Sequence, residues 1–239
     1  MDPMLPLQGG ADGACSGRRC MMVWLLVVLW IVGIGVGALV DRPVSQWVRD
    51  SGTAEAVRHH WITPVVKAPG VYYYAMVIAG VFWFLHPLKW RAGGLTLLTG
   101  IPGLANCLGK WIFGRARPFK LVGPMEQPAA FELHWFIGGL KGLFWQSNLA
   151  FPSGHSCTAF ATAAAMAILL PKWRWAFYVV AGMVAVERVL ENAHYVSDVI
   201  GGAGLGVFGV YVIVAYFRER EARGTLGAVA SSGCEVKHD

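Results

Sequence analysis

Residues 22–40 read MVWLLVVLWIVGIGVGALV and contain no charged side chain in 19 positions. A helix needs about 20 apolar residues to cross the hydrocarbon core of a bilayer, so this stretch predicts a membrane-spanning helix. Arg18 and Arg19 precede it, as basic residues precede the apolar core of a signal peptide. The run is longer than such a core, and no A-x-A cleavage site follows it closely, so we expect a retained span.

Five further apolar stretches follow, at 68–88, 92–109, 154–170, 175–186 and 199–217. The stretch at 175–186 is too short to span a membrane by itself, so its helix must continue through a charged turn that holds Glu187 and Arg188. Six spans predict an all-α fold, a six-transmembrane helical bundle over residues 22–217. We expect residues 1–21 and 218–239 to be polar tails, the second of them cytoplasmic.

Charged residues make up 14% of the chain and hydrophobic residues 56%. Soluble domains carry about 25% charged residues, so this composition argues against both a soluble enzyme and a disordered protein. The net charge of +6 comes from cations scattered between the apolar runs, so no nucleic-acid partner is expected. The five cysteines form no CxxC pair, which gives no indication of a disulfide framework or a zinc site.

The two shortest connections between the expected spans each hold two cations, Lys89 with Arg91 and Lys172 with Arg174. Short cytoplasmic loops concentrate Lys and Arg, so the pattern favours a cytoplasmic N-terminus. The longer connections, 41–67 and 114–153, then lie outside; they also hold cations, so a raw count does not decide the orientation. The second of them is rich in aromatic residues, which fits either a segment at the headgroup level or a loop packed onto the spans.

Three clusters of polar residues lie at the ends of the expected spans. They are Lys110-x6-Arg117-Pro118, Pro152-Ser153-Gly154-His155 and Arg188-x5-His194-x3-Asp198. With six spans, all three clusters face the same side of the membrane, whichever way the chain is oriented.

Each cluster also has an ordinary explanation. Lys110 and Arg117, about two helical turns apart and so on one helical face, are compatible with lipid binding or membrane topology. His155 is compatible with an interfacial residue beside a helix start. His194 and Asp198, four residues apart, are compatible with a structural contact on one helical face.

Together the clusters favour phosphoryl transfer. Ser153 is suited to cap a helix that starts at Gly154, whose free N–H groups form an anion site. Asp198 can hold one nitrogen of His194 and leave the other as a nucleophile. The cations neutralise a phosphoryl group, whose transfer requires mainly positioning and electrostatic stabilisation. No metal-ligand cluster is evident and none is needed, so no cofactor is expected, and the absence of a Walker pattern argues against nucleotide hydrolysis.

In this order the clusters resemble the three-part signature of the type 2 phosphatidic acid phosphatase superfamily, which includes membrane lipid phosphatases and soluble vanadium haloperoxidases. The resemblance covers about residues 70–217. It implies that His194 is the nucleophile, that Asp198 orients it and that His155 protonates the leaving lipid oxygen. It further implies metal-independent catalysis, with the phosphoryl oxygens held by Lys110, Arg117, Ser153, Gly154 and Arg188.

Glu187 departs from the signature, because many members have a serine phosphate ligand before the third-motif arginine. A glutamate before Arg188 removes the hydroxyl donor of that serine, and it adds a negative charge near the site unless Glu187 points away from the site. Arg115 has a weaker claim to a role, with an interfacial cation as the alternative. Asn192 and Tyr195 flank the nucleophile and fit packing residues.

The sequence therefore predicts a membrane-embedded lipid phosphatase that hydrolyses a phosphomonoester or pyrophosphate of a polyprenyl, glycerolipid or lipid A type lipid through a phosphohistidine. In a bacterial inner membrane, the expected orientation puts the site on the periplasmic or outer side. A catalytically idle lipid-phosphate-binding or transport protein is the alternative; loss of a histidine would favour it, and neither His155 nor His194 is lost. The haloperoxidases share the anion pocket but are soluble and larger, which six apolar spans argue against.

Overall fold

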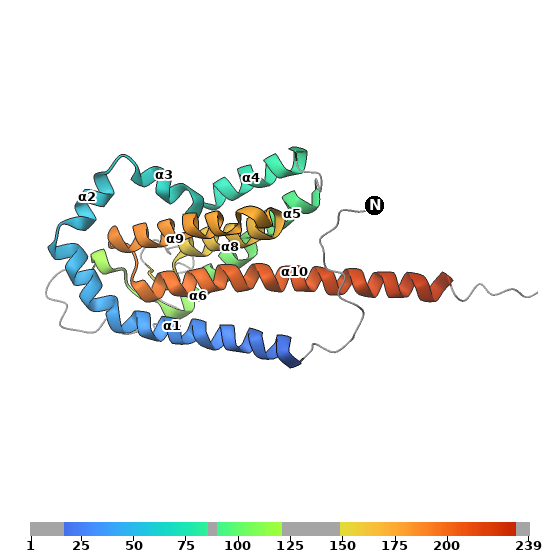
Figure 1. The fold of residues 1–239 in the computed structure, drawn as a ribbon. Coiled ribbons are helices and arrows are strands. Elements are labelled where there is room, and N and C mark those ends of the chain that lie inside the picture. Colours follow the sequence, from blue (N-terminus) through green and yellow to red (C-terminus); the bar gives the residue numbers. More distant parts are fainter. Residues whose placement is uncertain (1–16, 86–89, 121–148, 233–239) are drawn as a thin grey trace, which may run out of the picture.

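The computed structural model describes residues 17–85, 90–120 and 149–232, and helices dominate this part of the chain (Figure 1). The longer helices are α1 (Gly17–Asp50), α4 (Tyr72–Leu85), α5 (Trp90–Leu98), α6 (Gly100–Phe113), α8 (Gly154–Leu169), α9 (Arg174–Leu190) and α10 (Val196–Ser232). The short ones are α2 (Thr53–His59), α3 (Thr63–Lys67), η1 (Ala68–Gly70), η2 (Pro118–Lys120) and η4 (Pro171–Trp173). Apart from one isolated bridge between Ala116 and Leu149, the described residues contain no β-structure. The all-α prediction is confirmed.

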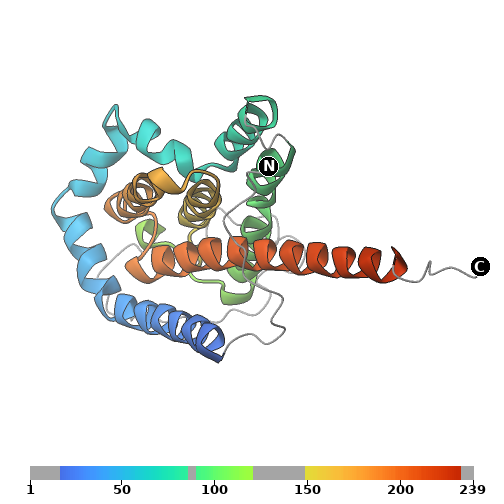
Figure 2. The same ribbon diagram turned by 45° about the vertical axis from the view of Figure 1, so that its right-hand side comes forward.

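Helix α8 forms the centre of the bundle, and most of its residues from Ser156 to Met166 are buried. Helices α9 and α10 pack against it, while α1 to α4 follow the outside of the bundle (Figures 1 and 2). A Cβ atom on Gly202 of α10 would lie 2.3 Å from the carbonyl oxygen of Ser153. The same holds for Gly206 and the carbonyl oxygen of Cys157. Only glycine allows two helix backbones to approach this closely, so these two positions fix α10 against the start of α8.

Among the described residues, two helical segments are long and apolar enough to cross a membrane, Met21–Asp50 and Val196–Glu221. A third is obtained if Thr63–Gly70 and Tyr72–Leu85, which meet at a bend of 69°, count as one span. Apolar side chains of α1 such as Leu25, Leu29 and Val36 are exposed on the isolated chain, as on a helix that faces lipid. The six-span count stays a prediction, because α5, α6, α8 and α9 each have 17 residues or fewer.

The helix boundaries differ from the apolar runs in three places. Helix α1 continues ten residues past the run at 22–40, and α10 continues to Ser232, well into the range expected to be a tail. The stretch at 92–109 is divided between α5 and α6 at Thr99. Helix α9 does continue through Glu187 and Arg188, as the short apolar run requires. Most of the aromatic connection at 114–153 lies outside the described residues.

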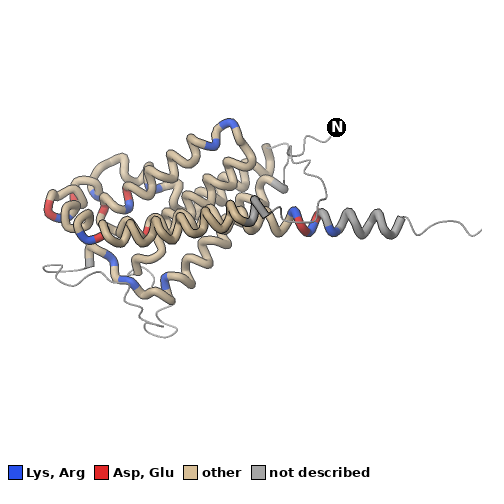
Figure 3. Tube along the Cα trace, turned by 60° about the horizontal axis from the view of Figure 1, so that its bottom comes forward, with Lys and Arg blue, Asp and Glu red and all other residues tan. Residues whose placement is uncertain are grey.

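Charged residues lie mostly at the ends of the described helices, whose middle parts carry few of them (Figure 3). One end of the bundle collects the last turns of α1, α6 and α9, the short helices α2 and α3, and the first turns of α8 and α10 (Figure 1). All three polar clusters of the sequence lie at this end.

Candidate active site

The first cluster begins in the last turn of α6 and continues beyond the helix. Gly114 ends α6 in a left-handed conformation with φ of 59°, and its N–H donates to the carbonyl oxygen of Lys110 at 2.9 Å. Glycine adopts this conformation without a steric penalty. The expectation that Lys110 and Arg117 share a helical face is therefore wrong, because the helix ends between them. Arg117 instead follows a turn, and its Nε donates to the carbonyl oxygen of Leu149 at 3.3 Å.

The second cluster caps α8 as the sequence predicts. The Ser153 hydroxyl oxygen accepts hydrogen bonds from the backbone N–H of Ser156 at 3.5 Å and from its hydroxyl at 3.1 Å. A Cβ atom on Gly154 would lie 3.8 Å from Nζ of Lys110 and 3.4 Å from Nδ2 of Asn106. The ammonium group of Lys110 thus reaches the N-terminus of α8, where the helix dipole favours an anion.

The third cluster places His194 in the connection before α10, so His194 and Asp198 do not share a helical face as expected. Asp198 lies in the first turn of α10, and its Oδ2 accepts the backbone N–H of Tyr195 at 2.8 Å, one half of a capping box. The same Oδ2 lies 3.6 Å from Nδ1 of His194. This separation is too long for a hydrogen bond, so the carboxylate and the ring lie in contact without one.

The surroundings of His194 keep its ring neutral. Burial lowers the pKa of His194 to about 4, Asp198 acts in the opposite direction, and the charges of Arg117 and Lys110 lower it further. The ring therefore carries a lone pair at neutral pH, which a nucleophile requires. The first cluster and the third are in direct contact, since Arg115 donates to Oδ1 of Asp198 at 2.7 Å.

The backbone connects the second cluster to the third. The N–H of Ser153 donates to the carbonyl oxygen of Asp198 at 3.0 Å, and the N–H of His194 donates to that of Arg188 at 3.2 Å. A Cβ atom on Gly70 would lie 2.9 Å from the Cβ of His155, so η1 packs directly against His155. The described structure thus brings together all eight residues that the sequence assigns to the site, while their roles stay predictions.

Glu187 does not point away from the site. Its carboxylate accepts Nε of Arg188 at 2.6 Å and a second N–H of the same guanidinium, and Glu191 also pairs with Arg188. Two carboxylates therefore offset the positive charge of Arg188. Arg117 lines the same pocket as Arg188, and burial together with the charge of Arg188 lowers the pKa of Arg117.

A buried ionic network supports the site from α1, and the sequence analysis missed most of it. Arg115 donates to Oδ1 of Asp198 at 2.7 Å and to Oδ2 of Asp41 at 2.8 Å, with its guanidinium 3.9 Å from the ring centre of Tyr195. Asp41 also accepts the backbone N–H of Ser197 at 2.9 Å. All of these groups are buried, so Arg115 is not an exposed interfacial cation.

A second contact from α1 reaches the same connection. Ser45 donates its hydroxyl to Oδ1 of Asn192 at 2.8 Å, and Asn192 has a left-handed φ of 54°. Helix α1 therefore contacts the segment that carries His194 at both ends. No local sequence signal marks Asp41 or Ser45, since their partners lie 74 to 156 residues away in the chain.

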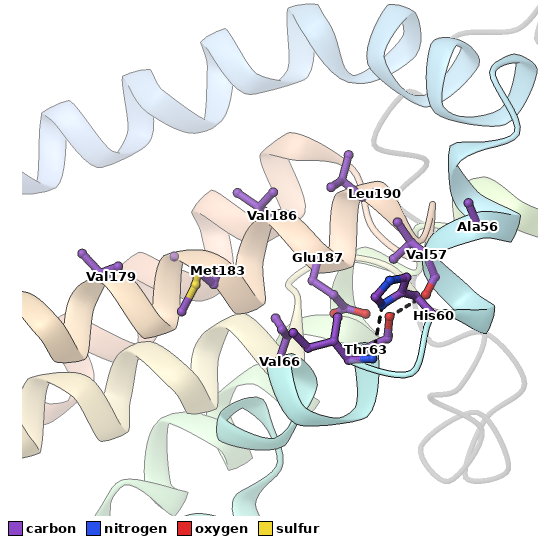
Figure 4. Close-up of a pocket in the computed structure, with 12 residues that line it drawn as sticks. Ala56, Val57, His60, Thr63, Val66, Val179, Met183, Val186, Glu187 and Leu190 are labelled. Atoms are coloured by element: carbon purple, nitrogen blue, oxygen red, sulfur yellow. Dashed lines mark hydrogen bonds between the residues drawn. The ribbon is translucent and has the colours of Figure 1, made fainter.

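An apolar groove of about 630 Å³ runs beside the site, between α2 and α3 on one side and α9 on the other. Val57, Val66, Met183 and Leu190 are among its lining side chains, and Glu187 lies among them near Thr63 (Figure 4). Within the described ranges, no group of three or more His, Cys, Asp or Glu side chains is arranged to bind a metal ion.

Residues 90–222 match the family model of the PAP2 superfamily. The chain belongs to this superfamily. It is 35% identical over 139 residues to a lipid A 1-phosphatase of Rhizobium etli, covering 55% of this chain and 53% of that protein. It is 27% identical over 191 residues to phosphatidylglycerophosphatase B of Bacillus subtilis, covering 72% of this chain and 83% of that protein. The predicted resemblance to the superfamily is confirmed.

A solved structure shares the fold. It is the crystal structure of a transmembrane PAP2 type phosphatidylglycerolphosphate phosphatase from Bacillus subtilis, with a TM-score of 0.51 and 22% sequence identity. The match covers 80% of this PAP2 chain and 96% of the crystallised one. By contrast, the chain spans about half the length of the Rhizobium lipid A phosphatases that it matches.

Proposed function

We propose that this PAP2 protein is a membrane lipid phosphatase that transfers a phosphoryl group from a lipid to His194 and then to water. The observation that carries the proposal is the buried pair of His194 and Asp198, with Lys110 and Arg117 close enough to lower the pKa of the histidine. A neutral imidazole beside a carboxylate and facing fixed cations suits nucleophilic attack on an anionic phosphorus centre.

In the first step, Nε2 of His194 attacks phosphorus while Nδ1 faces Asp198. The bond from phosphorus to the lipid oxygen breaks, and His155, which must enter this step as the imidazolium, gives its proton to that oxygen and becomes neutral. In the second step, His155 removes a proton from water, and the resulting hydroxide attacks phosphorus. The phosphorus–nitrogen bond then breaks, which releases inorganic phosphate and restores His194. No step in this scheme requires a metal ion.

Asp198 stabilises the charge that develops on His194, and the other polar groups hold the phosphoryl oxygens. Lys110 contributes to this cradle at the N-terminus of α8, beside Gly154, and the charges of Lys110 and Arg117 both act on His194. The Ser153 hydroxyl supports the cradle through the helix cap. An arginine carries five N–H donors, and Glu187 and Glu191 accept only some of those of Arg188. The remaining N–H groups of Arg188 can donate to the phosphoryl oxygens.

A lipid phosphate is the substrate class that the surroundings favour. The apolar groove lies against the charged end of the bundle and suits a hydrocarbon chain whose headgroup occupies the cradle. The names of the relatives agree with this class, since they include lipid A 1-phosphatase, phosphatidylglycerophosphatase B and an undecaprenyl-diphosphatase of Sulfolobus acidocaldarius. The phosphoryl ester is expected to belong to a polyprenyl, glycerolipid or lipid A type lipid.

Release of phosphate by the purified protein tests the proposal. The wild type should hydrolyse a short-chain lipid phosphate, and His194→Ala should lose several powers of ten in rate, as loss of a nucleophile does. His59→Ala is the matched control, because His59 is an exposed histidine on α2 outside the site. Lipid binding without release of phosphate by the wild type would favour an idle binding or transport protein instead.

The cytoplasmic N-terminus and an outward-facing site are part of the same proposal. Cysteine introduced at Asp50, at the charged end of the bundle, should react with an impermeant thiol reagent in spheroplasts. Cysteine introduced at Lys172, in the exposed connection before α9, should react only after lysis. The native cysteines must first be replaced. Labelling in the opposite order would invert the topology.

A further inference from the structure

Helix α6 carries one side-chain amide, that of Asn106, within the uncharged run at 92–109. Asn106 is buried, with 2% of its surface exposed. An asparagine amide has one acceptor and two donors, and buried polar groups are rarely left unpaired. Yet Oδ1 of Asn106 has no hydrogen-bond partner among the described residues. The described fold therefore does not offset the cost of burying this amide, and none of the three motifs includes it.

Asn106 lies on the face of α6 that packs into the bundle. The buried residues of α6 are Pro102, Asn106 and Lys110, which follow one another at intervals of four and so share one helical face. A Cβ atom on Gly209 would lie 2.5 Å from Cγ of Pro102, so the start of this face packs against α10. The rest of the face is polar and consists of the amide of Asn106 and the ammonium group of Lys110.

These two polar groups converge on the first residue of α8. A Cβ atom on Gly154 would lie 3.4 Å from Nδ2 of Asn106 and 3.8 Å from Nζ of Lys110. Because Gly154 has no Cβ atom, an oxygen atom of a ligand can approach the backbone at this point. Such an oxygen would lie within reach of both side-chain nitrogens.

The start of α8 supplies backbone donors at the same place. The first N–H groups of a helix have no partner within the helix, and the Ser153 hydroxyl accepts that of Ser156. Within the part of the chain that the structure describes, the N–H groups of Gly154 and His155 are left to a ligand, at a helix end that favours an anion. The amide of Asn106 adds a neutral donor to this group, and Lys110 adds a charged one.

We propose that Asn106 is a further catalytic residue, whose Nδ2 donates a hydrogen bond to a phosphoryl oxygen bound between Lys110 and the N-terminus of α8. This role rests on the proposed function and adds a residue to its site. Charge is spread over the equatorial phosphoryl oxygens in the transition state, where a preorganised donor contributes most. Oδ1 can then accept an N–H of Lys110, one turn further along α6, so the bound phosphoryl group leaves both ends of the amide paired.

Asn106→Leu tests this role in the purified full-length protein, because leucine has the branched shape of asparagine without its polar atoms. With a short-chain lipid phosphate, kcat should fall about a hundredfold, as it does on loss of one transition-state donor, while KM changes little. Orthovanadate mimics five-coordinate phosphorus, so its Ki should rise about as much as kcat/KM falls. The unfolding temperature of the unliganded variant should not fall, because the atoms removed are buried and unpaired.

Thr99→Val is the matched control on the same helix. Thr99 is buried and its hydroxyl donates to the carbonyl oxygen of Thr96 at 2.6 Å, so this variant should unfold at a lower temperature but keep the wild-type kcat and vanadate inhibition. If Asn106→Leu fails to fold, Asn106→Asp keeps the volume and removes both donors. Its kcat should fall at least as far, because the carboxylate also repels the phosphoryl group.

Two results would overturn the assignment of Asn106. One is a lower unfolding temperature of Asn106→Leu with kcat close to that of the wild type, which would make Asn106 a packing residue only. The other is a loss of kcat with unchanged inhibition by orthovanadate. If the wild type hydrolyses no lipid phosphate at all, the proposed function itself fails, which is a separate outcome.

Discussion

Replacing Arg115 with methionine should destabilise the protein and disturb the catalytic connection at the same time. Arg115 is buried and donates to two carboxylates, Asp41 on α1 and Asp198 on α10, at 2.8 and 2.7 Å. Methionine keeps most of the volume but removes the charge. Both carboxylates then remain buried near Ser197 without their common cation.

The size of the effect follows from the geometry. Removing one partner of a buried ion pair costs about 3–5 kcal/mol, because an uncompensated charge is left in a low-dielectric interior. The second substitution Asp41→Asn should partly reverse this loss, since it removes one of the two stranded charges. A coupling of about 0.5–3 kcal/mol is typical of residues in direct contact, and a favourable value in the double variant is expected here.

Denaturant unfolding in detergent, measured for the wild type, both single variants and the double variant, gives this coupling. Turnover of lipid phosphate should fall in Arg115→Met at a temperature where the protein stays folded, with a larger effect on kcat than on KM, because Asp198 orients the nucleophile. Arg115→Lys keeps the charge and should retain part of the stability. A loss below about 1 kcal/mol in Arg115→Met, or strictly additive losses in the double variant, would refute the network as described.

Three further predictions concern pH, metals and helix packing. In the pH profile of kcat/KM, activity should be lost on the acid side near pH 4 rather than near the ordinary histidine value of 6.5, because burial lowers the pKa of His194 and protonation below about 4 removes its lone pair. Asp198→Asn should move this loss to a lower pH still, since the carboxylate raises the pKa of His194. A loss of activity that begins above pH 6.5 would contradict the assignment. Activity should survive EDTA, because the scheme uses cations of the chain as charge stabilisers; loss on chelation with recovery in Mg²⁺ would require a different mechanism. Gly202→Ala should lower stability and activity, because its Cβ would lie 2.3 Å from the carbonyl oxygen of Ser153. The control is Gly103→Ala, which has open space around it and should be neutral, or stabilising by up to about 1 kcal/mol, in thermal unfolding.

Local signals in the sequence predicted local structure well. Ser153 precedes an apolar run, and it caps α8 where the pattern places the cap. The continuation of α9 through Glu187 and Arg188 follows from the length of the apolar run and is also found. In both cases the information lies within one or two helical turns of chain.

Spacing alone was a poor guide to how the site residues meet. Lys110 and Arg117 were expected on one helical face, but Gly114 ends the helix between them. His194 and Asp198 were likewise expected to share a helical face, but α10 starts after His194. Asp198 instead caps α10 by accepting the backbone N–H of Tyr195, the residue next to His194. The residues converge all the same, because chain reversals and helix ends bring them to one end of the bundle.

Long-range partners could not be found in one sequence. Asp41 lies at the end of an apolar span and has the appearance of a boundary residue, yet its contacts with Arg115 and Ser197 are 74 and 156 residues distant. Lys67 likewise has the appearance of a loop cation until α3 packs on α9 and pairs it with Glu191. Such pairs depend on how the helices are arranged, and helical periodicity carries no information about that arrangement.

The most direct test of the central claim is to trap the covalent intermediate. Purified protein mixed with a lipid phosphate labelled in its phosphoryl group, and quenched within the first turnover, should carry the label in an acid-labile, base-stable bond. Mass spectrometry of the peptide that contains Asn192 to Asp198 should place the phosphate on His194, and His194→Ala should carry none. Turnover by the wild type with no label on the protein, or label on any other residue, would contradict nucleophilic attack by His194.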